Sequence, residues 1–236
     1  MTKIISNIVN TNVVSCAIIY PIVDKKKRKE ITMTVYNDKT GESIANLAII
    51  RGKLMNDFSN LNKKDSDFCG NVISVKRSSG AVDEIPIAIP KRMAENIIQK
   101  EVSITGEWRS KNYYRDGKMH MKHYLLVREI RHEEAEDHNE IMLTGFVCKP
   151  PEYRETSLGK GVGRMVIAVN RPYGRGDYIR CVTWNQNARR AYNLKVGDKI
   201  SITGRIQSRE YMRKIEGVER VSVAYEVSVE KITKEE

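Results

Sequence analysis

The stretch VSITGEWRSKNYYRDG, residues 102–117, decides the fold because it occurs a second time as ISITGRIQSREYMRKIEG, residues 200–217. The shared Ser-Ile-Thr-Gly motif begins at Ser103 and again at Ser201. Further matches keep the same order on both sides: Asn46, Gly52, Val75, Arg77, Gly80, Asp83, Val127 and Ile130 match Asn139, Gly145, Val169, Arg171, Gly174, Asp177, Val229 and Ile232. The spacing grows stepwise, as expected when insertions fall in loops. Two copies of one domain are therefore predicted, at 45–131 and 139–233.

Each copy has the pattern of a small β-barrel. Apolar residues alternate with polar ones from Val221 to Val229, which predicts a strand with one buried face. Glycines interrupt such strands at matching places, where barrels bend sharply. One helix fits between the third and fourth strands of each copy, at Lys91–Ile98 and Gln186–Tyr192. Five strands with this helix are typical of the OB-fold, so we expect a mainly β protein with two tandem five-stranded OB-fold barrels.

Two segments fall outside the repeat. Residues 1–44 form an N-terminal extension, which we expect to be β-rich, with two strands around a turn at Asn37–Gly41. Its basic run, Lys25–Lys29, is read as a solvated loop, with a nucleic-acid contact as the alternative. Residues 132–138 are acidic and lack apolar periodicity, so they are predicted to be a linker.

The composition favours a soluble protein with an anionic partner. The chain has 236 residues and a net charge of +11, and its 40% hydrophobic content suffices for a packed core. The sequence lacks a long apolar membrane span and a secretory signal, and its four cysteines lack C-x-x-C spacing. We expect a cytoplasmic protein with reduced thiols, without a membrane partner, whose charge suits nucleic acid.

The second copy resembles a known family. The segment from Asn139 to Ala191, including AVNR at residues 168–171 and YIRCVTW at residues 178–184, followed by VGDKISITGRIQSREY at residues 196–211, is similar to bacterial single-stranded DNA-binding proteins. The tandem arrangement over residues 45–233 resembles the two-OB-fold members of clostridia-like bacteria.

The resemblance implies sequence-tolerant binding of single-stranded DNA in replication, recombination and repair. It also implies assemblies that present four OB-folds, which a homodimer of this chain would supply. Members of the family usually end in a flexible tail with an acidic tip that recruits proteins. The sequence ends at Glu236 without such a tail, which puts the recruitment of protein partners by that route in doubt.

Candidate binding residues follow from the chemistry of single strands, whose bases stack on aromatic rings and whose phosphates attract Lys and Arg. Tyr178, Arg180, Val182 and Trp184 share one face of the third strand at period two. The resemblance places stacking aromatics at Tyr178, Trp184 and Tyr211, and Tyr173 approximates a fourth. The alternative for Trp184 is burial in the core. The cationic candidates for phosphate or cation–π contacts are Arg171, Arg175, Arg180, Arg205 and Arg209.

The first copy lacks this arrangement. Glu84, Pro86, Ala88 and Pro90 stand at the places of Tyr178, Arg180, Val182 and Trp184. Tyr113 is retained as the counterpart of Tyr211 in the repeat. Trp108 is expected in the core. The prolines predict an edge or irregular strand. The first copy is therefore a diverged OB-fold that binds weakly or serves oligomerisation or a protein contact.

Other functions remain open at this stage. The chain could be an interaction module, such as an accessory protein of replication restart or plasmid maintenance, or an RNA-binding protein, since OB-folds also bind RNA. An enzyme is not expected, because the sequence shows no reactive constellation. Neither a metal site nor a cofactor is predicted. His120 and His123 would point to opposite faces of a strand, which is a poor metal site.

Overall fold

The structure is a computed structural model, and it describes residues 45–56, 67–98, 100–115, 117–132, 136–171, 174–215 and 218–235. The predicted N-terminal strands, the basic run and Tyr173 lie outside these residues. Residues from Ala45 onward form one compact unit of strands with two short helices. The mainly β fold class is therefore confirmed.

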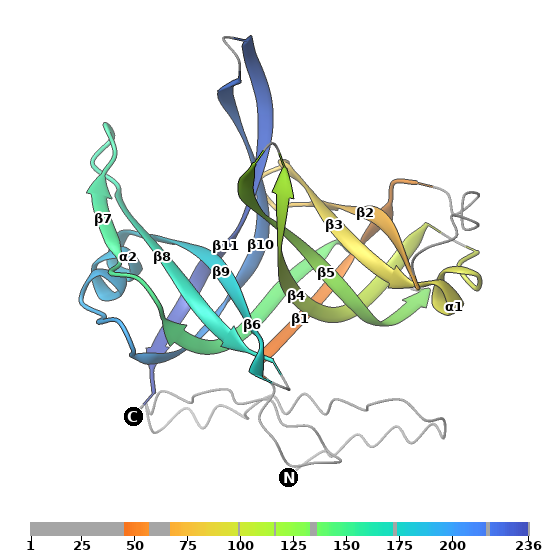
Figure 1. Ribbon diagram of the computed structural model, residues 1–236, viewed down its shortest axis with the longest axis horizontal. Coiled ribbons are helices and arrows are strands. Elements are labelled where there is room, and N and C mark those ends of the chain that lie inside the picture. The colour runs from red at the N-terminus through yellow and green to blue at the C-terminus, as the bar shows by residue number, and fades with distance from the viewer. Residues whose placement is uncertain are drawn as a thin grey trace. The chain divides into compact units, whose positions relative to one another are not determined.

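The first barrel is closed by five strands (Figure 1). Its elements are β1 (Asn46–Leu54), β2 (Phe68–Lys76), β3 (Val82–Pro90), α1 (Lys91–Ala94), β4 (Glu101–Arg115) and β5 (Lys118–His132). The strands follow the order β2-β3-β5-β4-β1, and β1 pairs again with β2, so the sheet closes on itself. The pair β3–β5 is parallel and the others are antiparallel. Closure with α1 between the third and fourth strands is the OB-fold arrangement.

The second barrel repeats this plan and adds one strand. Its elements are β6 (His138–Val147), β7 (Glu152–Glu155), β8 (Gly161–Asn170), β9 (Gly176–Trp184), α2 (Asn185–Tyr192), β10 (Lys199–Ile215) and β11 (Val218–Lys234). The order β6-β10-β11-β9-β8 closes through a β6–β8 pairing. The additional strand β7 forms a hairpin with β8. The sequence did not indicate β7, because four residues are too few to show a period of two.

Glycines in the strands are required where two strands cross closely. A Cβ atom added at Gly52 would lie 2.3 Å from the carbonyl oxygen of Ser74, and one at Gly145 would lie 2.5 Å from that of Ala168. No side chain fits at such distances, so only glycine lets the first strand of each barrel bend across the second. The predicted role of these glycines as barrel corners is confirmed.

An asparagine performs the same task in both barrels. The Asn46 side chain donates to the Trp108 carbonyl oxygen at 2.8 Å and accepts from the Trp108 amide at 2.9 Å. Asn139 makes the same two bonds to Ile206, at 2.7 and 3.0 Å. Each amide side chain acts like a peptide group. It satisfies the backbone amide and carbonyl of a strand residue beside the β-bulge that follows Thr105 or Thr203.

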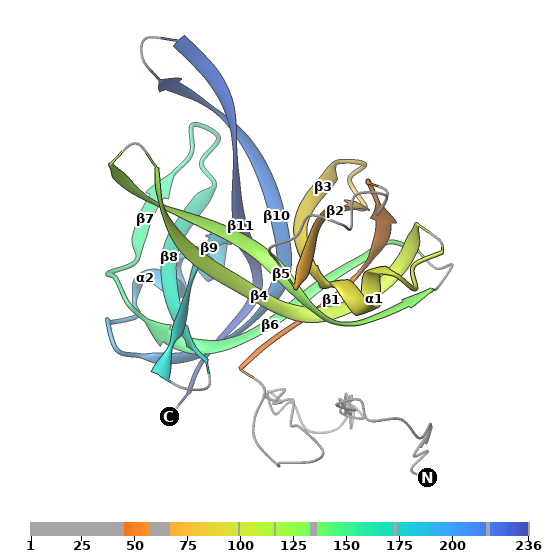
Figure 2. The same cartoon turned by 45° about the vertical axis from the view of Figure 1, so that its right-hand side comes forward.

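The barrels are joined by pairing of their first strands, which continues the hydrogen bonding from one barrel into the other (Figure 2). Strands β1 and β6 run antiparallel, with Ala48 opposite Ile141 and Asn46 opposite Leu143. Because Ala48 and Ile141 occupy equivalent positions of the repeat, the two barrels are related by an approximate two-fold axis through this pair. Contacts from one barrel to the other therefore occur in matched sets.

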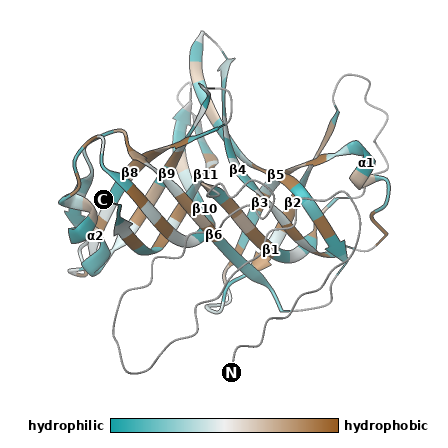
Figure 3. Ribbon diagram, turned by 90° about the horizontal axis from the view of Figure 1, so that it is seen from below, coloured by the Kyte–Doolittle hydropathy of each residue, from teal (hydrophilic) through white to brown (hydrophobic). Residues whose placement is uncertain are grey.

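The core follows the predicted alternation, visible as brown and teal bands along the strands (Figure 3). Trp108 is fully buried and confirms its predicted place in the core, and Tyr225 packs edge-to-face against it with centroids 6.4 Å apart. The expectation of one buried face from Val221 to Val229 is partly wrong: Val227 and Val229 are buried, whereas Val221 is 59% exposed. The β10–β11 hairpin extends beyond the barrel there (Figure 1).

Two further expectations for the first barrel are corrected. Its helix ends at Ala94 rather than Ile98, because the Asn96 side chain donates to the Arg92 carbonyl oxygen at 2.9 Å and ends the helical pattern. Strand β3 is not an edge or irregular strand: it pairs with β2 along its whole length. Within the described strands it pairs with β5 at only two positions. The strand therefore tolerates prolines, which have no amide hydrogen to donate to a neighbouring strand.

Candidate nucleic-acid interface

Strand β9 presents a row of large side chains to solvent. Tyr178 is 45% exposed and Trp184 42% exposed, and Arg180 is exposed between them. Ile179 and Cys181 point inward and are buried. Three of the four residues expected on this face are exposed, whereas the fourth, Val182, is buried. The alternative prediction that Trp184 is buried in the core is wrong. The two rings are six positions apart along the strand, which is a span of roughly 20 Å at about 3.3 Å per residue.

A second basic and aromatic surface lies on β10. Tyr211 is 38% exposed, and the Arg209 guanidinium lies 5.6 Å from its ring centroid, within cation–π range. Arg209 also approaches Glu226, with 3.6 Å from Nε to Oε1. Arg205 is half-buried and donates to Gln207 at 3.4 Å. Arg205, Arg209 and Tyr211 alternate along the strand and therefore share one face.

The predicted cation Arg171 has a partner within the protein. Its guanidinium donates through two nitrogens to the carboxylate of Asp177, which is fully buried. Burial alone would raise the pKa of Asp177, but hydrogen bonds from Arg171, the Ser110 amide and Arg109 outweigh it and hold that pKa below its ordinary value. The charge of Arg171 is thus compensated in place. Arg175, by contrast, is exposed.

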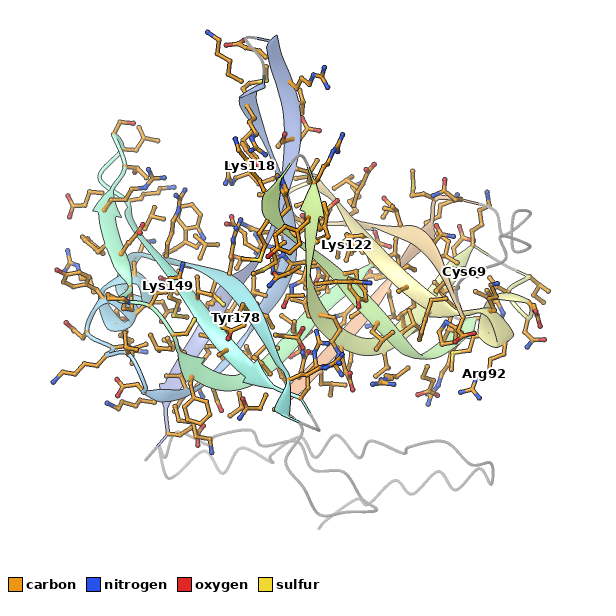
Figure 4. The ribbon with its side chains drawn as sticks, viewed as in Figure 1. Cys69, Arg92, Lys118, Lys122, Lys149 and Tyr178 are labelled. Atoms are coloured by element: carbon orange, nitrogen blue, oxygen red, sulfur yellow. The ribbon has the colours of Figure 1, made fainter. Side chains whose placement is uncertain are left out.

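The first barrel offers a different surface. Its β3 carries exposed Glu84 and half-buried Pro86 and Pro90 at the places of the β9 row. Tyr113 on β4 is 39% exposed and stacks on His120 of β5, with centroids 5.4 Å apart. Lys118 and Lys122 also project from β5 (Figure 4). An aromatic ring and positive charge are therefore present on the β4–β5 hairpin, whereas the aromatic and basic row of the third strand is missing from β3.

Two residues of the β4–β5 hairpin that the sequence analysis missed reach the β9 row. Ser110 Oγ accepts a hydrogen bond from the Tyr178 amide at 3.0 Å, and His123 Nε2 lies 3.0 Å from the Tyr178 carbonyl oxygen. Figure 4 marks Tyr178 on β9. One sequence signal pointed to this region, the Arg-x₅-Asp spacing that occurs at Arg77–Asp83 and again at Arg171–Asp177. The spacing predicts an ion pair in each barrel, but it does not indicate which strand of the other barrel contacts the aspartate.

Other kinds of site were sought in the part of the chain that the structure describes. Among these residues, no three His, Cys, Asp or Glu side chains gather as metal ligands. None of the described helices is long and apolar enough to span a membrane. An open cavity of about 270 Å³ lies between the β7–β8 hairpin and α2, lined by Tyr153, Gly159, Gly161, Asn185, Gln186 and Arg189.

Comparison with known proteins identifies the second barrel. The Single-strand binding protein family matches residues 138–234. Single-stranded DNA-binding protein B of Bacillus subtilis is 36% identical over 80 residues, which cover 31% of this chain and 71% of that protein. The chain belongs to the single-strand binding protein family. Single-stranded DNA-binding protein 3 of Listeria innocua is 39% identical over 80 residues, covering 31% of this chain and 50% of that protein. The chain thus spans about half the length of this relative.

The structural likeness reaches further along the chain than the family match. The crystal structure of wild-type single-stranded DNA binding protein from Thermus aquaticus superposes with a TM-score of 0.63, covering 81% of this chain and 93% of that chain at 16% identity. A deletion mutant of the same protein gives a TM-score of 0.59, with 80% and 94% covered at 18% identity. At such identity the likeness shows the fold, and its extent includes the first barrel.

Proposed function

We propose that this member of the single-strand binding protein family binds single-stranded DNA with little sequence preference and acts without catalysis. The observation that carries the proposal is the exposed row of Tyr178, Arg180 and Trp184 on β9. Rings held outward on a rigid strand can stack any base, since every base has a π-face, and the intervening guanidinium can neutralise a phosphate. Such binding suits the handling of exposed strands during replication, recombination and repair in the cytoplasm.

The wider contact surface follows from charge and exposure. Tyr211 with Arg209 continues the aromatic and basic character on β10, and Arg175 and Arg205 add positive charge. Tyr173 is a further candidate for base stacking. Arg171 is left out of the phosphate contacts because Asp177 already compensates its charge. Tyr113, with His120 stacked beside it, supplies a weaker site on the first barrel.

The test is a binding titration with oligothymidine. Trp184→Ala should weaken affinity by about 1–3 kcal/mol, because one base loses its stacking partner. Tyr192→Ala is the matched control, since Tyr192 is an exposed aromatic on α2 outside the row, and it should leave affinity unchanged. Affinity should also fall with salt, at a log–log slope of about −0.7 per phosphate neutralised. Equal affinities for Trp184→Ala and wild type would refute stacking at this residue.

The nature of the nucleic acid is tested in the same way. We propose DNA as the partner because the relatives are named for it. A competition between matched DNA and RNA oligonucleotides distinguishes the two partners, since only RNA has a 2′-hydroxyl that a protein can recognise. Preference for RNA would replace the proposal by RNA binding.

We also propose that two chains form a dimer with four barrels. Pairing of β1 with β6 creates a continuous sheet. Its outward side, away from core-facing Ala48 and Ile141, carries half-buried Ile49 and Met142 together with Glu140, which is paired with Ile49. A second sheet would cover this face. Light scattering should give twice the chain mass, and Ile49→Glu should give monomers with unchanged circular dichroism. A wild-type monomer at micromolar concentration would contradict the dimer.

A further inference from the structure

Tyr178 is held from outside its own barrel. Strand β9 pairs with β8 from Gly176 to Trp184, but within the described strands it pairs with β11 only at Cys181 and Val182. At Tyr178 the other side of β9 therefore lacks a neighbouring strand of the second barrel. Ser110 and His123 occupy this side, and they lie directly opposite each other in β4 and β5. Figure 2 shows the β4–β5 hairpin crossing toward β9, which β4 contacts.

The two residues satisfy both backbone groups of Tyr178. The amide of Tyr178 donates to Ser110 Oγ at 3.0 Å, and its carbonyl oxygen accepts from His123 Nε2 at 3.0 Å. Burial lowers the pKa of His123, so its ring is neutral at pH 7, and the carbonyl acceptor requires the tautomer with hydrogen on Nε2. These contacts replace the missing strand, since unpaired amide and carbonyl groups at an edge are costly and leave it mobile.

The residue before Tyr178 is fixed to the same hairpin. Asp177 accepts from the Ser110 amide at 2.5 Å and from Arg109 Nη1 at 2.9 Å. Arg171, bound to Asp177, donates to the Ser110 carbonyl oxygen at 2.8 Å. The amide, carbonyl and hydroxyl of Ser110 are thus all directed to the second barrel. Charge-assisted bonds of this kind are stronger than neutral ones and fix the geometry of β9 where the row begins.

The approximate two-fold axis supplies a matched set of contacts in the opposite direction. The Ser208 amide donates to Asp83 at 2.7 Å, and Ser208 Oγ accepts from the Glu84 amide at 3.2 Å. Here the residue that is held is Glu84, which has no ring to stack, and Tyr225 stands in the place of His123. The same architecture therefore positions a ring in one direction only.

We infer that Ser110 and His123 of the first barrel are positioning residues for Tyr178, so that the diverged barrel contributes to DNA binding across the interface. The inference rests on the proposed function, because it requires Tyr178 to stack on a base. A ring on a strand that is already ordered loses less freedom on binding, which strengthens the complex. Neither residue needs to touch the DNA.

The experiment compares two serine variants with the wild-type chain. Ser110→Ala should weaken oligothymidine binding about 2- to 10-fold, whereas Ser208→Ala, which removes the equivalent hydroxyl, should leave affinity unchanged. Ser110→Thr keeps a hydroxyl and should restore affinity. Each titration is run well below the thermal midpoint of the variant, so that loss of folded protein does not enter the comparison.

A double-mutant cycle separates positioning from general damage. In a Tyr178→Ala background, Ser110→Ala should cause no further loss, because no ring is left to position. Equal affinities of Ser110→Ala and Ser208→Ala, or a further loss in the Tyr178→Ala background, would overturn the inference. If Tyr178→Ala itself binds as wild type, the proposed stacking at Tyr178 fails instead. Should Ser110→Ala fail to fold, His123→Gln enters the same cycle.

Discussion

In the second barrel β9 exposes Tyr178, Arg180 and Trp184, while β3 of the first barrel carries Glu84, Pro86 and Pro90 at the same register. The inward residues of both strands are buried, and each set combines an aspartate with apolar side chains, Asp83 with Ile85 and Asp177 with Ile179. The two copies thus share what closes a barrel and differ in what faces solvent. Net charge does not separate them, because residues 45–131 and residues 139–236 each have six more Lys and Arg than Asp and Glu. The outward face of the third strand does.

The largest expected effect concerns the buried carboxylates that join the barrels. Asp177→Ala should reduce the free energy of unfolding by about 3–5 kcal/mol, because it leaves Arg171 without its carboxylate and removes one of the two carboxylates paired with the largely buried Arg109. Asp83→Ala should cost less, since its partner Arg77 is more exposed than Arg109. Denaturant unfolding measures both. A larger loss for Asp83→Ala would contradict this ranking.

Next in size is an exchange between the two third strands. Tyr178→Glu gives the second barrel the residue of the first, and it should weaken DNA affinity by at least about 1–3 kcal/mol through the lost stack, with charge repulsion added. Tyr178→Phe keeps the ring and is the control. Oligothymidine titration at fixed salt measures both variants, and similar affinities for the two would show that the ring is not used.

Much of this comparison could be predicted from the sequence, because it depends on local periodicity. Alternation placed Tyr178 and Trp184 on one face, and the repeat register identified Glu84 and Pro90 as their counterparts. The contacts of Ser110 and His123 could not be predicted, since they join strands more than fifty residues apart through an interface that no local pattern encodes. Alternation also misassigned Val221, because a hairpin keeps its period of two after it leaves the barrel.

A smaller effect is expected from pH. The pKa of His123 is lowered chiefly by burial, with Arg180 nearby also disfavouring its charged form. His123 therefore binds a proton more readily in the unfolded chain than in the folded one. The free energy of unfolding should consequently fall as pH drops below about 6.5. The equivalent Tyr225 of the second barrel does not take up a proton in this range. Thermal midpoints between pH 7.5 and 5.5 measure the effect.

The control for the pH effect is His123→Gln, which retains an N–H donor but does not titrate. Its thermal midpoint should depend less on pH than that of the wild type. An unchanged pH dependence would assign the effect to other groups.

The smallest expected effect is a gain. Glu84→Tyr should strengthen DNA binding by no more than about 1 kcal/mol, since a ring is restored on an otherwise altered face. Glu84→Gln removes the charge alone and separates repulsion from stacking. Unchanged affinity in both variants would show that bound DNA does not reach β3.

The two tryptophans test the central claim most directly, because each barrel holds one. Trp108 is fully buried in the core, and Trp184 is exposed on the β9 row. Tryptophan fluorescence during titration with oligothymidine should be quenched in the wild type, and Trp184→Phe, which retains Trp108, should lose that quenching. Quenching that persists in Trp184→Phe would contradict the assignment of the binding surface to β9 of the second barrel.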